Sequence, residues 1–576
     1  MLRPANLLLA LCLSWNAAAV TVTGRVTLDQ NNDGRAEATE PPVVGALVSD
    51  EHSLVRTAAD GTYRLEADGV GSIFVVNPPG TWPAGPWWAR PGTGPTATVD
   101  FALREQPQTE TFLFVHGTDM HTHPPAAAAY ARYLDHVNNL PLPPVFVVHT
   151  GDLIRDGNAQ TPEQAGAAFD DYLSASAALR APRRDLMGNH EVVGVANSTV
   201  PETAPGFGKA LFRQKVGPAS YAFRYGRTHF VALDGTSLQG RTLRYALTPE
   251  SAAWAAAYLA LVPSDEGVVI LIHEPLGIGP GESTLLAALQ GKRLLGTLCG
   301  HGHERVITRW GDAPQVMGGA VSYAWHGMQP FPPQPYGYVV WRVAPEGLEW
   351  VFVDWAEERS IDLMAPLPAL LLTSQVTLRG AVNDFTGDIT AVHAQLAGRQ
   401  VEALCTRRKL ATAFEATLDT GGLQDGVYDL ALTAFAGERS FTEKEPVVVV
   451  NGLPAPFTPS GPATLTFQVD GVAGPDNQVL VNGQPLATIP ATPARQQLTF
   501  EVPATYLRRL NEVVFRGVER DGGRDKLRFS LIALTYEGRR HRDVRFAINN
   551  PRTLLTKPEH VAYVDLAYTG PRGLMP

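Results

Sequence analysis

The sequence has little cysteine and no long apolar run. It contains 3 cysteines in 576 residues, and Cys12 lies in an N-terminal stretch that we expect to be removed. Cys299 and Cys405 alone form no disulfide framework, so we expect both to be buried as small apolar side chains. After the N-terminal stretch no segment reaches about 18 uninterrupted apolar residues, so we expect no membrane-spanning helix.

The sequence also lacks an excess of basic charge. Charged residues make up 18% of it, and 47 Lys and Arg stand against 57 Asp and Glu, for a net charge of −10. Because no basic field would attract nucleic acid or an anionic membrane, we expect neither as a partner. The 44% of hydrophobic residues is too high for a disordered chain, so we expect folded domains.

The N-terminus, residues 1–19, has the pattern of a secretory signal peptide. Arg3 supplies a short positive region, Leu7–Leu13 supply an apolar region, and three alanines at 17–19 supply the small residues of a cleavage site. We therefore expect a protein that is secreted, periplasmic or held at the cell surface. The alternative is an uncleaved membrane anchor, for which the apolar region is short.

Glycine and proline are abundant, with 54 and 46 residues, which predicts many turns and many short strands. Four folded regions are expected after the signal peptide: a β-sandwich over 20–105, an α/β region over 106–360, and two all-β modules over 361–452 and 453–570. In the α/β region apolar strands alternate with helices that we expect over 126–137, 162–179, 249–261 and 283–290. Such alternation predicts βα units with both sheet faces covered.

Side chains that can bind metal follow five of the strands expected in the α/β region. Any one of them alone is common at a strand end and is more often structural. Because open sheets hold their ligands at the carboxyl ends of the strands, we expect these five strand ends to meet in one site. The side chains are Asp119 and His121, Asp152, Asn189 and His190, His273, and His301 and His303.

The donor types indicate which ions the site would hold. Carboxylate and amide oxygens with neutral imidazoles suit divalent Mn, Fe and Zn, whereas a site without thiolates does not favour soft metals. These donors are more than one tetrahedral ion accepts, which predicts two ions that share a carboxylate, and Asp152 is the natural bridge. Two such ions about 3.5–4 Å apart clamp a phosphoryl group and hold a bridging hydroxide that attacks phosphorus. The pattern therefore predicts a phosphoesterase.

The order of these motifs resembles the signature of the calcineurin-like metallophosphoesterases. The motifs are Asp119-x-His121, Gly151-Asp152, Gly188-Asn189-His190, His273 and Gly300-His301-x-His303. The resemblance implies a multidomain chain whose α/β region is a four-layer domain, a β-sandwich flanked by helices. It implies phosphomonoesters or phosphodiesters as substrates. The order of the modules also resembles secreted bacterial members of the family that carry N- and C-terminal β-sandwich modules.

The same resemblance assigns a role to each side chain. It implies a first metal held by Asp119, His121, Asp152 and His303, and a second metal held by Asp152, Asn189, His273 and His301. It implies that His190 is no ligand and that its imidazole, with an ordinary pKa of about 6.5, stabilises the transition state or protonates the leaving oxygen. Purple acid phosphatases, a neighbouring branch, carry a tyrosine where this chain has Arg155, so we expect no purple-type iron site.

Four further polar residues lie near the motifs. We expect His116, His123 and His149 to have structural or supporting roles, because none of them occupies a ligand position of the motifs. Glu191 follows His190 and is either an acceptor behind the site or a solvated side chain.

A second metal pattern lies near the mature N-terminus. Five ligand positions of an EF-type calcium loop are filled by Asp29, Asn31, Asp33, Arg35 through its carbonyl, and Glu40. Strand patterns on both sides exclude a helix-loop-helix hand, and the loop resembles those of secreted bacterial β-sandwich modules, where calcium is structural. The alternative is an acidic turn held by side-chain hydrogen bonds to its own backbone.

The two C-terminal modules carry no catalytic pattern. Gly426 and Tyr428 resemble the tyrosine corner of an immunoglobulin-like sandwich, and the strands of 453–570 resemble a jelly-roll carbohydrate-binding domain. These modules would contact a glycan or the cell envelope, or act as spacers or lids. Two other functions stay open: a non-catalytic extracellular protein that binds a glycan or partner beside a relic phosphoesterase domain, and a nuclease, against which the acidic total argues.

Overall fold

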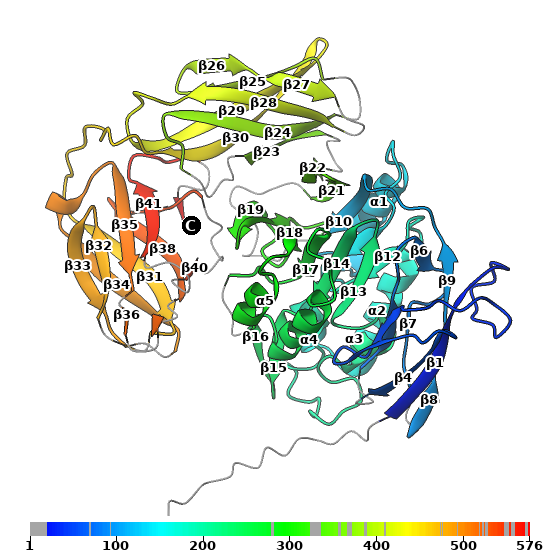
Figure 1. Cartoon of the computed structure of the whole chain (residues 1–576). Coiled ribbons are helices and arrows are strands. Elements are labelled where there is room, and N and C mark those ends of the chain that lie inside the picture. Colours follow the sequence, from blue (N-terminus) through cyan, green and yellow to red (C-terminus); the bar gives the residue numbers. More distant parts are fainter. Residues whose placement is uncertain are drawn as a thin grey trace, which may run out of the picture. The chain divides into compact units, whose positions relative to one another are not determined.

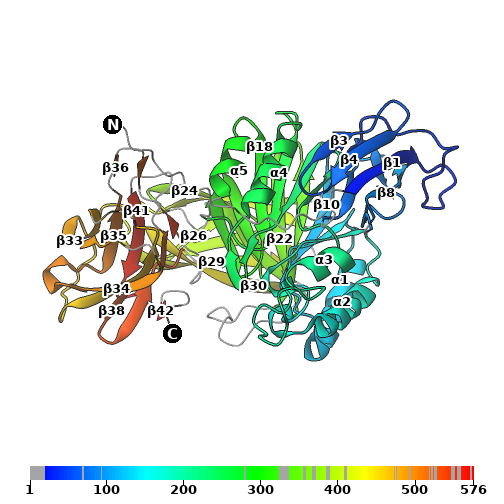
Figure 2. The same ribbon diagram turned by 90° about the horizontal axis from the view of Figure 1, so that it is seen from below.

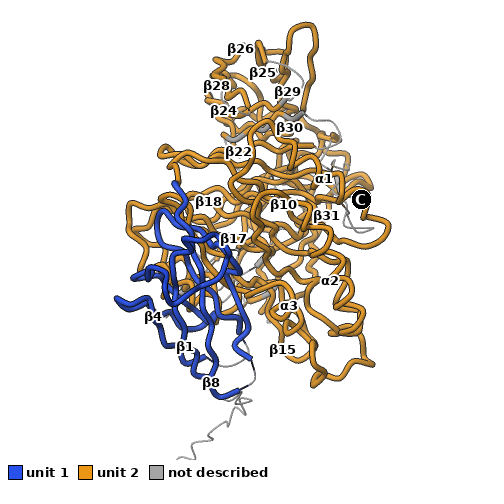
Figure 3. Tube along the Cα trace, turned by 90° about the vertical axis from the view of Figure 1, so that its right-hand side faces the viewer, with its two compact units in different colours: residues 1–107 blue, residues 108–576 orange. Residues whose placement is uncertain are grey.

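The chain divides into two compact units, Met1–Pro107 and Gln108–Pro576 (Figure 3). The computed structural model describes residues 20–576 with the exception of 68–70, 93, 278–280, 323–335, 355–358, 366–370, 385–388, 408–410, 473, 475, 492–493, 518, 521–522, 525–527, 546–551, 554–558, 571–573 and 576. The expected signal peptide, residues 1–19, lies outside the described residues. No helix of the described residues is long and apolar enough to cross a membrane.

The first unit consists of two β-sheets around an apolar core. One sheet has the order β4 (Thr62–Ala67), β1 (Val20–Leu28), β9 (Phe101–Glu105) and β6 (Thr81–Pro83), with β8 (Thr96–Thr98) also paired with β1. The other has the order β3 (Leu54–Arg56), β2 (Leu47–Ser49), β5 (Ile73–Val76) and β7 (Trp88–Ala89). Val22, Val48 and Phe101 are buried in one core cluster, so the alternating apolar residues of these strands face each other between the sheets.

The second unit begins with a pair of sheets that carries the five α-helices of the described residues (Figure 1). The five-stranded sheet has the order β12 (Arg183–Asp185), β11 (Val147–His149), β10 (Phe112–Gly117), β21 (Gly337–Ala344) and β22 (Gly347–Asp354). The six-stranded sheet has the order β13 (Tyr221–Tyr225), β14 (Thr228–Leu233), β17 (Gly267–Ile272), β18 (Arg293–Cys299), β20 (Ala313–Gly318) and β19 (Arg305–Trp310). Phe114 lies 5.1 Å from Phe146 and 5.2 Å from Phe230, ring centre to ring centre, so aromatic rings join the two sheets.

Helices cover the outer faces of this pair of sheets. The helices are α1 (Ala127–Asn138), α2 (Pro162–Ser176), α3 (Ala210–Lys215), α4 (Pro249–Leu259) and α5 (Glu282–Ala288). Tyr133 of α1, Phe169 of α2 and Phe212 of α3 share a buried cluster with Val115 and Val340 of the five-stranded sheet. Figure 2 shows α4 and α5 on the other side of the strands. The expected four layers of helix, sheet, sheet and helix are therefore confirmed.

Four of these helices lie where the sequence predicted them. The start of the helix α2 was predictable because a capping box precedes it. Thr161 accepts a hydrogen bond from the backbone N–H of Gln164, and the Gln164 side chain accepts one from the backbone of Thr161. The short helix α3 and the hairpin of β15 (Thr236–Gln239) and β16 (Thr242–Tyr245) were not predicted. Both are too short to show a period in the sequence.

The next region is an eight-stranded β-sandwich. Its strands are β23 (Arg359–Ala365), β24 (Gln375–Asp384), β25 (Ala391–Leu396), β26 (Arg399–Glu402), β27 (Leu404–Arg407), β28 (Thr412–Asp419), β29 (Gly426–Ala436) and β30 (Arg439–Val449). The sheet orders β23-β24-β28-β27 and β26-β25-β29-β30 are those of an immunoglobulin-like sandwich. Tyr428 at the start of β29 donates its hydroxyl to the carbonyl of Gln424 at 2.8 Å, the hydrogen bond of a tyrosine corner.

The last region is also all-β. Its strands are β31 (Ala463–Asp470), β32 (Asn477–Val481), β33 (Gln484–Ile489), β34 (Gln496–Val502), β35 (Leu510–Arg516), β36 (Glu519–Arg520), β37 (Gly523–Arg524), β38 (Arg528–Tyr536), β39 (Arg539–Arg542), β40 (Arg552–Thr553), β41 (Glu559–Asp565) and β42 (Leu574–Met575). Phe467, Phe515 and Phe529 fill the core between its two main sheets. The expected series of all-β modules is thus present, whereas their boundaries at 105, 360 and 452 stay predictions.

The two described cysteines form no disulfide. Cys299 ends β18 and is buried, as expected, and burial raises the pKa of its thiol above the ordinary value. Cys405 lies on β27 and is partly buried against the core cluster of its sandwich, so the expectation of a buried side chain holds only in part for it. Its strand pairs with β28 and faces solvent on one side, where a small residue is tolerated.

Candidate metal centre

The side chains that the sequence singled out follow strands of both sheets of the α/β region. Asp119 and His121 follow β10, Asp152 follows β11, and Asn189 and His190 follow β12, three strands that are parallel neighbours. His273 follows β17, and His301 and His303 follow β18, which are parallel neighbours in the other sheet. The carboxyl ends of two sheets therefore contribute to one place, which is the usual position of a ligand site in an open sheet.

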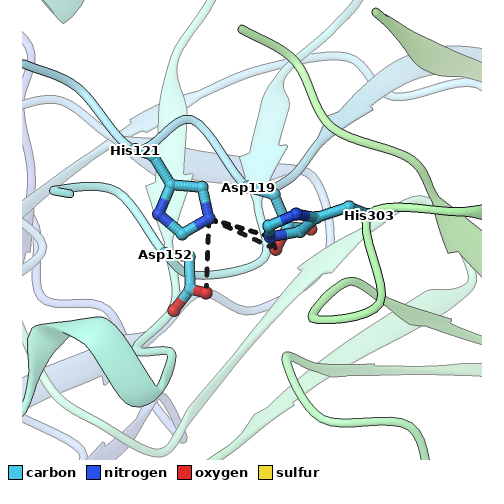
Figure 4. Close-up of side chains that lie close together, drawn as sticks. All are labelled: Asp119, His121, Asp152 and His303. Carbon is cyan, nitrogen blue, oxygen red and sulfur yellow. Dashed lines mark hydrogen bonds and ion pairs between the residues drawn. The ribbon is translucent and has the colours of Figure 1, made fainter. Parts of the chain in front are cut away.

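Two groups of ligand atoms form there, and they share one carboxylate. The first group is Asp119, His121, Asp152 and His303 (Figure 4), and the second is Asp152, His273 and His301. Within each group the ligand atoms lie within 4.8 Å of one another. Among the described residues these are the two places where at least three His, Cys, Asp or Glu side chains converge in this way.

The first group is compact and buried. His303 Nε2 lies 3.2 Å from Asp119 Oδ1 and 3.0 Å from His121 Nε2. His121 Nε2 lies 3.6 Å from Asp152 Oδ2, and Figure 4 shows all four side chains pointing toward a common centre. Two carboxylates and two imidazoles at such separations form a donor set for a divalent cation.

The second group adds an amide oxygen to its imidazoles. His273 Nε2 lies 3.1 Å from Asp152 Oδ2, the same oxygen that faces His121. Asn189 Oδ1 lies 2.8 Å from His301 Nδ1, so the amide of Asn189 joins this group. The structure therefore brings together all seven side chains that the sequence suggested as ligands.

The protonation of the imidazoles suits metal binding. Burial lowers the pKa of His121 to about 3 and that of His301 to about 4, so both rings are neutral near pH 7. Burial also lowers the pKa of His273, but the carboxylate of Asp152 outweighs it and raises that pKa well above its ordinary value. A cation bound by His273 would take the place of this proton, because a ligating imidazole is neutral. The residues present therefore fit a pair of divalent ions.

The backbone is strained at these positions. Asp119, His121, Asp152, His301 and His303 have φ angles of 53°, 45°, 53°, 71° and 55°, in the left-handed region that favours glycine. They are five of the twelve non-glycine residues with positive φ among the described residues. Each such conformation costs about 1–3 kcal/mol, and such strain gathers at functional sites, where the surrounding structure holds it.

Glycines in the motifs leave room for the ligands. A Cβ on Gly188 would lie 2.4 Å from Asp152 Oδ1, and a Cβ on Gly300 would lie 1.9 Å from Thr118 Oγ1 and 2.6 Å from Asp119 Oδ2. Real Cβ atoms do not approach other atoms so closely. Glycine is therefore required at the start of both motifs for steric reasons, so that neighbouring backbone can approach the ligands.

Glu191 holds two of the ligand loops together. Its buried carboxylate accepts hydrogen bonds from the backbone N–H groups of Asp152 at 2.8 Å, Leu153 at 2.7 Å, Ile154 at 3.1 Å and Gly188 at 2.7 Å. Burial and the charge of Asp152 raise the pKa of Glu191 to about 7, while these N–H donors favour the ionised form. Of the two alternatives for Glu191, the acceptor behind the site is the one observed.

His190 lies beside the first group without belonging to it. Its Nε2 is 3.9 Å from Asp152 Oδ2, and its ring meets that of His121 edge to face at 4.8 Å. On the other side its Nδ1 is 3.6 Å from Asp156 Oδ1. Burial lowers the pKa of His190, but the carboxylates of Asp152 and Asp156 outweigh it and raise that pKa to about 9. The imidazole is 16% exposed, so it is within reach of a ligand and holds a proton near pH 7.

Sequence reasoning missed Asp156. It lies four residues after Asp152, in a loop where an acidic residue carries no pattern of its own. The signal that could have found it is chemical: an imidazole expected to donate a proton through one nitrogen needs an acceptor at the other.

The three neighbouring histidines have other partners. His116 Nε2 lies 2.8 Å from Thr150 Oγ1, and His123 Nδ1 lies 2.6 Å from the carbonyl oxygen of His121. His149 lies between Tyr133 at 3.0 Å and Tyr172 at 2.7 Å. None of them belongs to either group of ligand atoms, and their contacts support the loops and the core behind the site.

The acidic loop of the first unit has a different geometry. Asp29 accepts hydrogen bonds from the backbone N–H groups of Asn32 at 2.7 Å and Gly34 at 2.9 Å, and Glu40 accepts from Gln30 and Glu37, both at 3.0 Å. Asn31 and Asp33 each accept from the backbone two residues later, at 2.9 and 2.8 Å. The strands β1 and β2 flank the loop, as expected. These bonds are those of the acidic turn, and calcium in this loop stays a prediction.

Comparison with known proteins identifies the α/β region. A family model described as calcineurin-like phosphoesterase matches residues 112–305. No curated protein matches the chain in sequence.

Solved structures resemble the chain only weakly. GAP50, the anchor in the inner membrane complex of Plasmodium, has a TM-score of 0.30 and 13% identity over 42% of this chain and 85% of its own. A predicted phosphoesterase from Streptococcus pneumoniae has a TM-score of 0.22 and 11% identity over 43% of this chain and 91% of its own. A putative 5'-nucleotidase from Staphylococcus aureus has a TM-score of 0.27 and 14% identity over 42% of this chain and 54% of its own.

Likenesses with such TM-scores carry no argument, and the assignment rests on the family model together with the buried Asp and His groups. Both concern the same segment, because all seven ligand candidates lie between Asp119 and His303. The chain therefore carries a calcineurin-like phosphoesterase domain at residues 112–305 and is a metal-dependent phosphoric ester hydrolase.

Proposed function

We propose that the chain hydrolyses phosphomonoesters or phosphodiesters at a centre of two divalent ions, Mn, Fe or Zn. The observation that carries this proposal is that Asp152 belongs to both groups of ligand atoms. One carboxylate between two donor sets is what a pair of ions at bridging distance needs. Asp119, His121 and His303 would complete the first site, and Asn189, His273 and His301 the second.

When bound, the two ions supply a nucleophile derived from water and neutralise the charge of the phosphoryl oxygens. The chain's own part is to hold the seven ligand side chains in one fixed arrangement. Glu191 ties the loop after β11 to the loop after β12 through four backbone hydrogen bonds. The site is thus organised before substrate arrives, which is a condition for fast chemistry.

His190 is the group that handles the leaving oxygen in this proposal. Burial lowers its pKa, but the carboxylate of Asp156, which is not among the ligand candidates, favours its protonated form. Asp156 on its Nδ1 side orients the ring, so that Nε2 faces the first metal group, where it lies 3.9 Å from Asp152 Oδ2. A proton delivered from Nε2 turns an alkoxide leaving group into an alcohol, which lowers the barrier to P–O cleavage.

We propose that the protein works outside the cytoplasm, on the strength of the signal-peptide pattern in residues 1–19. Calcium in the loop of residues 29–40 would be structural. The contact of the C-terminal modules with a glycan or the cell envelope has no support from the family match and is not part of this proposal.

The test combines elemental analysis with a panel of esters on metal-defined protein. We expect about two tightly held ions per chain and hydrolysis of a generic monoester or diester that a chelator abolishes. The panel should compare monoesters, diesters, nucleotides and phospholipids, because it also decides the ester class. Fewer than one ion per chain, or no hydrolysis of any ester by metal-loaded protein, would favour the alternative of a binding protein with a relic domain.

Two variants separate the roles of the residues. Asp152→Asn should lose both ions and activity while its far-ultraviolet circular dichroism stays native. His190→Ala should keep its ions and lose turnover by about 10²- to 10⁴-fold, the usual contribution of a general acid. His393→Ala, in the sandwich of residues 361–452, is the matched control and should change neither quantity. Native activity in both site variants would contradict the proposal.

A further inference from the structure

One aromatic side chain beside the metal groups is exposed. The exposed large apolar side chains of the described residues are Val44, Leu261, Leu404, Leu453 and Tyr245, so Tyr245 is the only aromatic ring among them, at 52% exposure. Its ring centre lies 4.7 Å from that of His301, at an angle of 57°. An aromatic ring that is left half in water next to a ligand candidate offers an apolar surface on which a bound molecule can pack.

The hairpin that carries Tyr245 turns it toward the site. Tyr245 on β16 pairs with Thr236 on β15, and Leu243 pairs with Leu238. Side chains two residues apart on a strand share a face, so these four residues lie on one face of the hairpin. Leu238 and Leu243 pack against the core cluster of the domain. Tyr245 therefore shares the inward face of the hairpin and lies against His301, while 52% of it stays exposed.

The hairpin is fixed at both of its ends. At its base the hydroxyl of Thr236 donates a hydrogen bond to the carboxylate of Glu274, the residue after His273. At its turn Arg241 donates to the carbonyl oxygens of Gly194 at 2.9 Å and Asn197 at 3.1 Å, in the loop that follows Glu191. Tyr245 is thus held by a rigid element attached to two ligand loops, and a rigid aromatic surface loses little entropy on binding.

The surroundings of the phenol are acidic. Its hydroxyl is neutral near pH 7, because the ordinary pKa of a phenol is about 10. That hydroxyl makes no hydrogen bond to any described residue. Among the described residues, the site therefore offers at this point a neutral ring face whose hydroxyl has no hydrogen-bond partner, next to ions that would hold a phosphoryl group.

We propose that Tyr245 forms an aromatic wall of the substrate cleft and stacks on a planar aromatic group of the phosphate ester. The inference rests on the proposed function and narrows it to esters that carry an aromatic ring, such as aryl, arylmethyl or nucleoside esters. The phosphoryl group would lie at the two metal groups, and the ring of the ester would lie against the exposed face of Tyr245. Tyr245 is then a residue that determines specificity and takes no part in the proton transfer of His190.

The test uses two phosphonates that the protein cannot hydrolyse. Benzylphosphonate and cyclohexylmethylphosphonate differ in whether the ring is planar and aromatic, and their binding to manganese-loaded protein is measured by calorimetry. Because an aromatic pair adds about 0.5–1.5 kcal/mol to plain apolar burial, we expect benzylphosphonate to bind about two- to tenfold more tightly. Tyr245→Leu should abolish this preference at unchanged metal content, and Tyr245→Phe should keep it.

Leu261→Ala is the matched control, since it changes another exposed apolar side chain of the same domain, and it should leave both affinities unchanged. Equal weakening of the two phosphonates in Tyr245→Leu, or no weakening, would overturn the proposal. Loss of metal in that variant would also overturn it, because Tyr245 would then support His301 instead of the substrate. Failure of the proposed function shows differently: the native protein would bind the phosphonates without hydrolysing benzyl phosphate.

Discussion

Two places in the chain have the pattern of a metal site, the loop of residues 29–40 and the cluster in the phosphoesterase domain, and they are built in opposite ways. In the loop of residues 29–40 the carboxylates accept hydrogen bonds from backbone within the same loop. In the phosphoesterase domain the carboxylates of Asp119 and Asp152 face imidazoles from strand ends up to 184 positions away, as from Asp119 to His303 (303 − 119 = 184). The first is a local structure and the second depends on the whole domain.

The difference lies in what satisfies the acidic oxygens. A turn whose carboxylates already accept hydrogen bonds from backbone N–H groups is stable without an ion. An ion would therefore bind to a preformed loop. In the cluster, five ligand candidates have left-handed backbone and face one another, and the fold around them carries the strain. We therefore expect a local acidic turn and a long-range cluster to respond differently to the same kind of substitution, and three experiments test this difference.

The largest effect is expected from the glycines that make room for the cluster. In Gly300→Ala the new methyl group would lie 1.9 Å from Thr118 Oγ1 and 2.6 Å from Asp119 Oδ2, so Asp119 must move. A displacement of about 1 Å at an active site lowers activity by about 10²-fold, and we expect at least that loss together with a loss of bound metal. Elemental analysis and kcat/KM on the panel's best ester measure both quantities.

Two controls complete this experiment. Gly461→Ala should change nothing, because a methyl group there meets no atom within 4 Å. Gly34→Ala alters the acidic loop, where glycine has a φ of 76°, and should leave metal content and kcat/KM native. If Gly300→Ala keeps both ions and its activity, the cluster tolerates displacement and is less dependent on its surroundings than we infer.

Much of the phosphoesterase domain could be predicted from sequence because its elements are long or end in motifs. The strands are continuous apolar runs, and Thr161 before the helix α2 forms with Gln164 in its first turn the capping box that is typical of a helix start. The ligand candidates could be predicted because they follow those strands directly. The parallel order of β10, β11 and β12 then brings their ends together.

The residues that sequence did not reveal are those whose role exists only in three dimensions. Nothing near Asp156 marks it as a partner of His190, because the two lie 34 positions apart (190 − 156 = 34) and meet only through the loops. Tyr245 lies on a hairpin of four-residue strands, too short for a pattern. Glu191 was noticed, but its four backbone partners could not be known before the loops were placed.

Arg305 shows how far the cluster's dependence extends. It lies two residues after His303 and donates to the carbonyl oxygen of Ile361 at 2.9 Å and to Glu443 Oε2 at 3.1 Å. The other oxygen of Glu443 accepts the backbone N–H of Ile361 at 2.9 Å, and the guanidinium lies 4.9 Å from the ring centre of Phe352. The loop of the last two ligand candidates is thus attached to the next β-sandwich.

Glu443→Gln is therefore expected to have an intermediate effect on the metal centre. Glu443 lies 138 positions from Arg305, and the two side chains are 29% and 20% exposed, so solvent screens part of the charge. We expect metal affinity to fall by about threefold, below the roughly 10- to 100-fold seen when a direct partner of a ligand is removed. Metal titration of the full chain measures this affinity.

A double-mutant cycle identifies the pair as the cause. The double variant with Arg305→Met should lose no more than the larger of the two single losses, because either single substitution already removes the ion pair. Glu438→Gln, an exposed glutamate of the same sandwich, should have native affinity. Additive losses of metal affinity would mean that the two residues act separately and that the sandwich does not stabilise the ligand loop through this pair.

The smallest effect is expected from a substitution in the acidic loop, and it should not change the metal centre. Backbone N–H groups, first that of Glu37, hold the pKa of Glu40 below its ordinary value. A carboxyl whose pKa is lowered in the folded state stabilises the fold above its unfolded pKa of about 4.3. This contribution is lost as the pH falls through the folded pKa.

In Glu40→Gln, hydrogen exchange of residues 29–40 should be faster than in native protein at pH 7, and the difference should vanish at low pH. Glu105→Gln, exposed in the same unit, should exchange as native, and kcat/KM should be native in both variants. A Glu40→Gln protein with impaired ester hydrolysis would show that the loop is not local, and the contrast with the metal centre would fail.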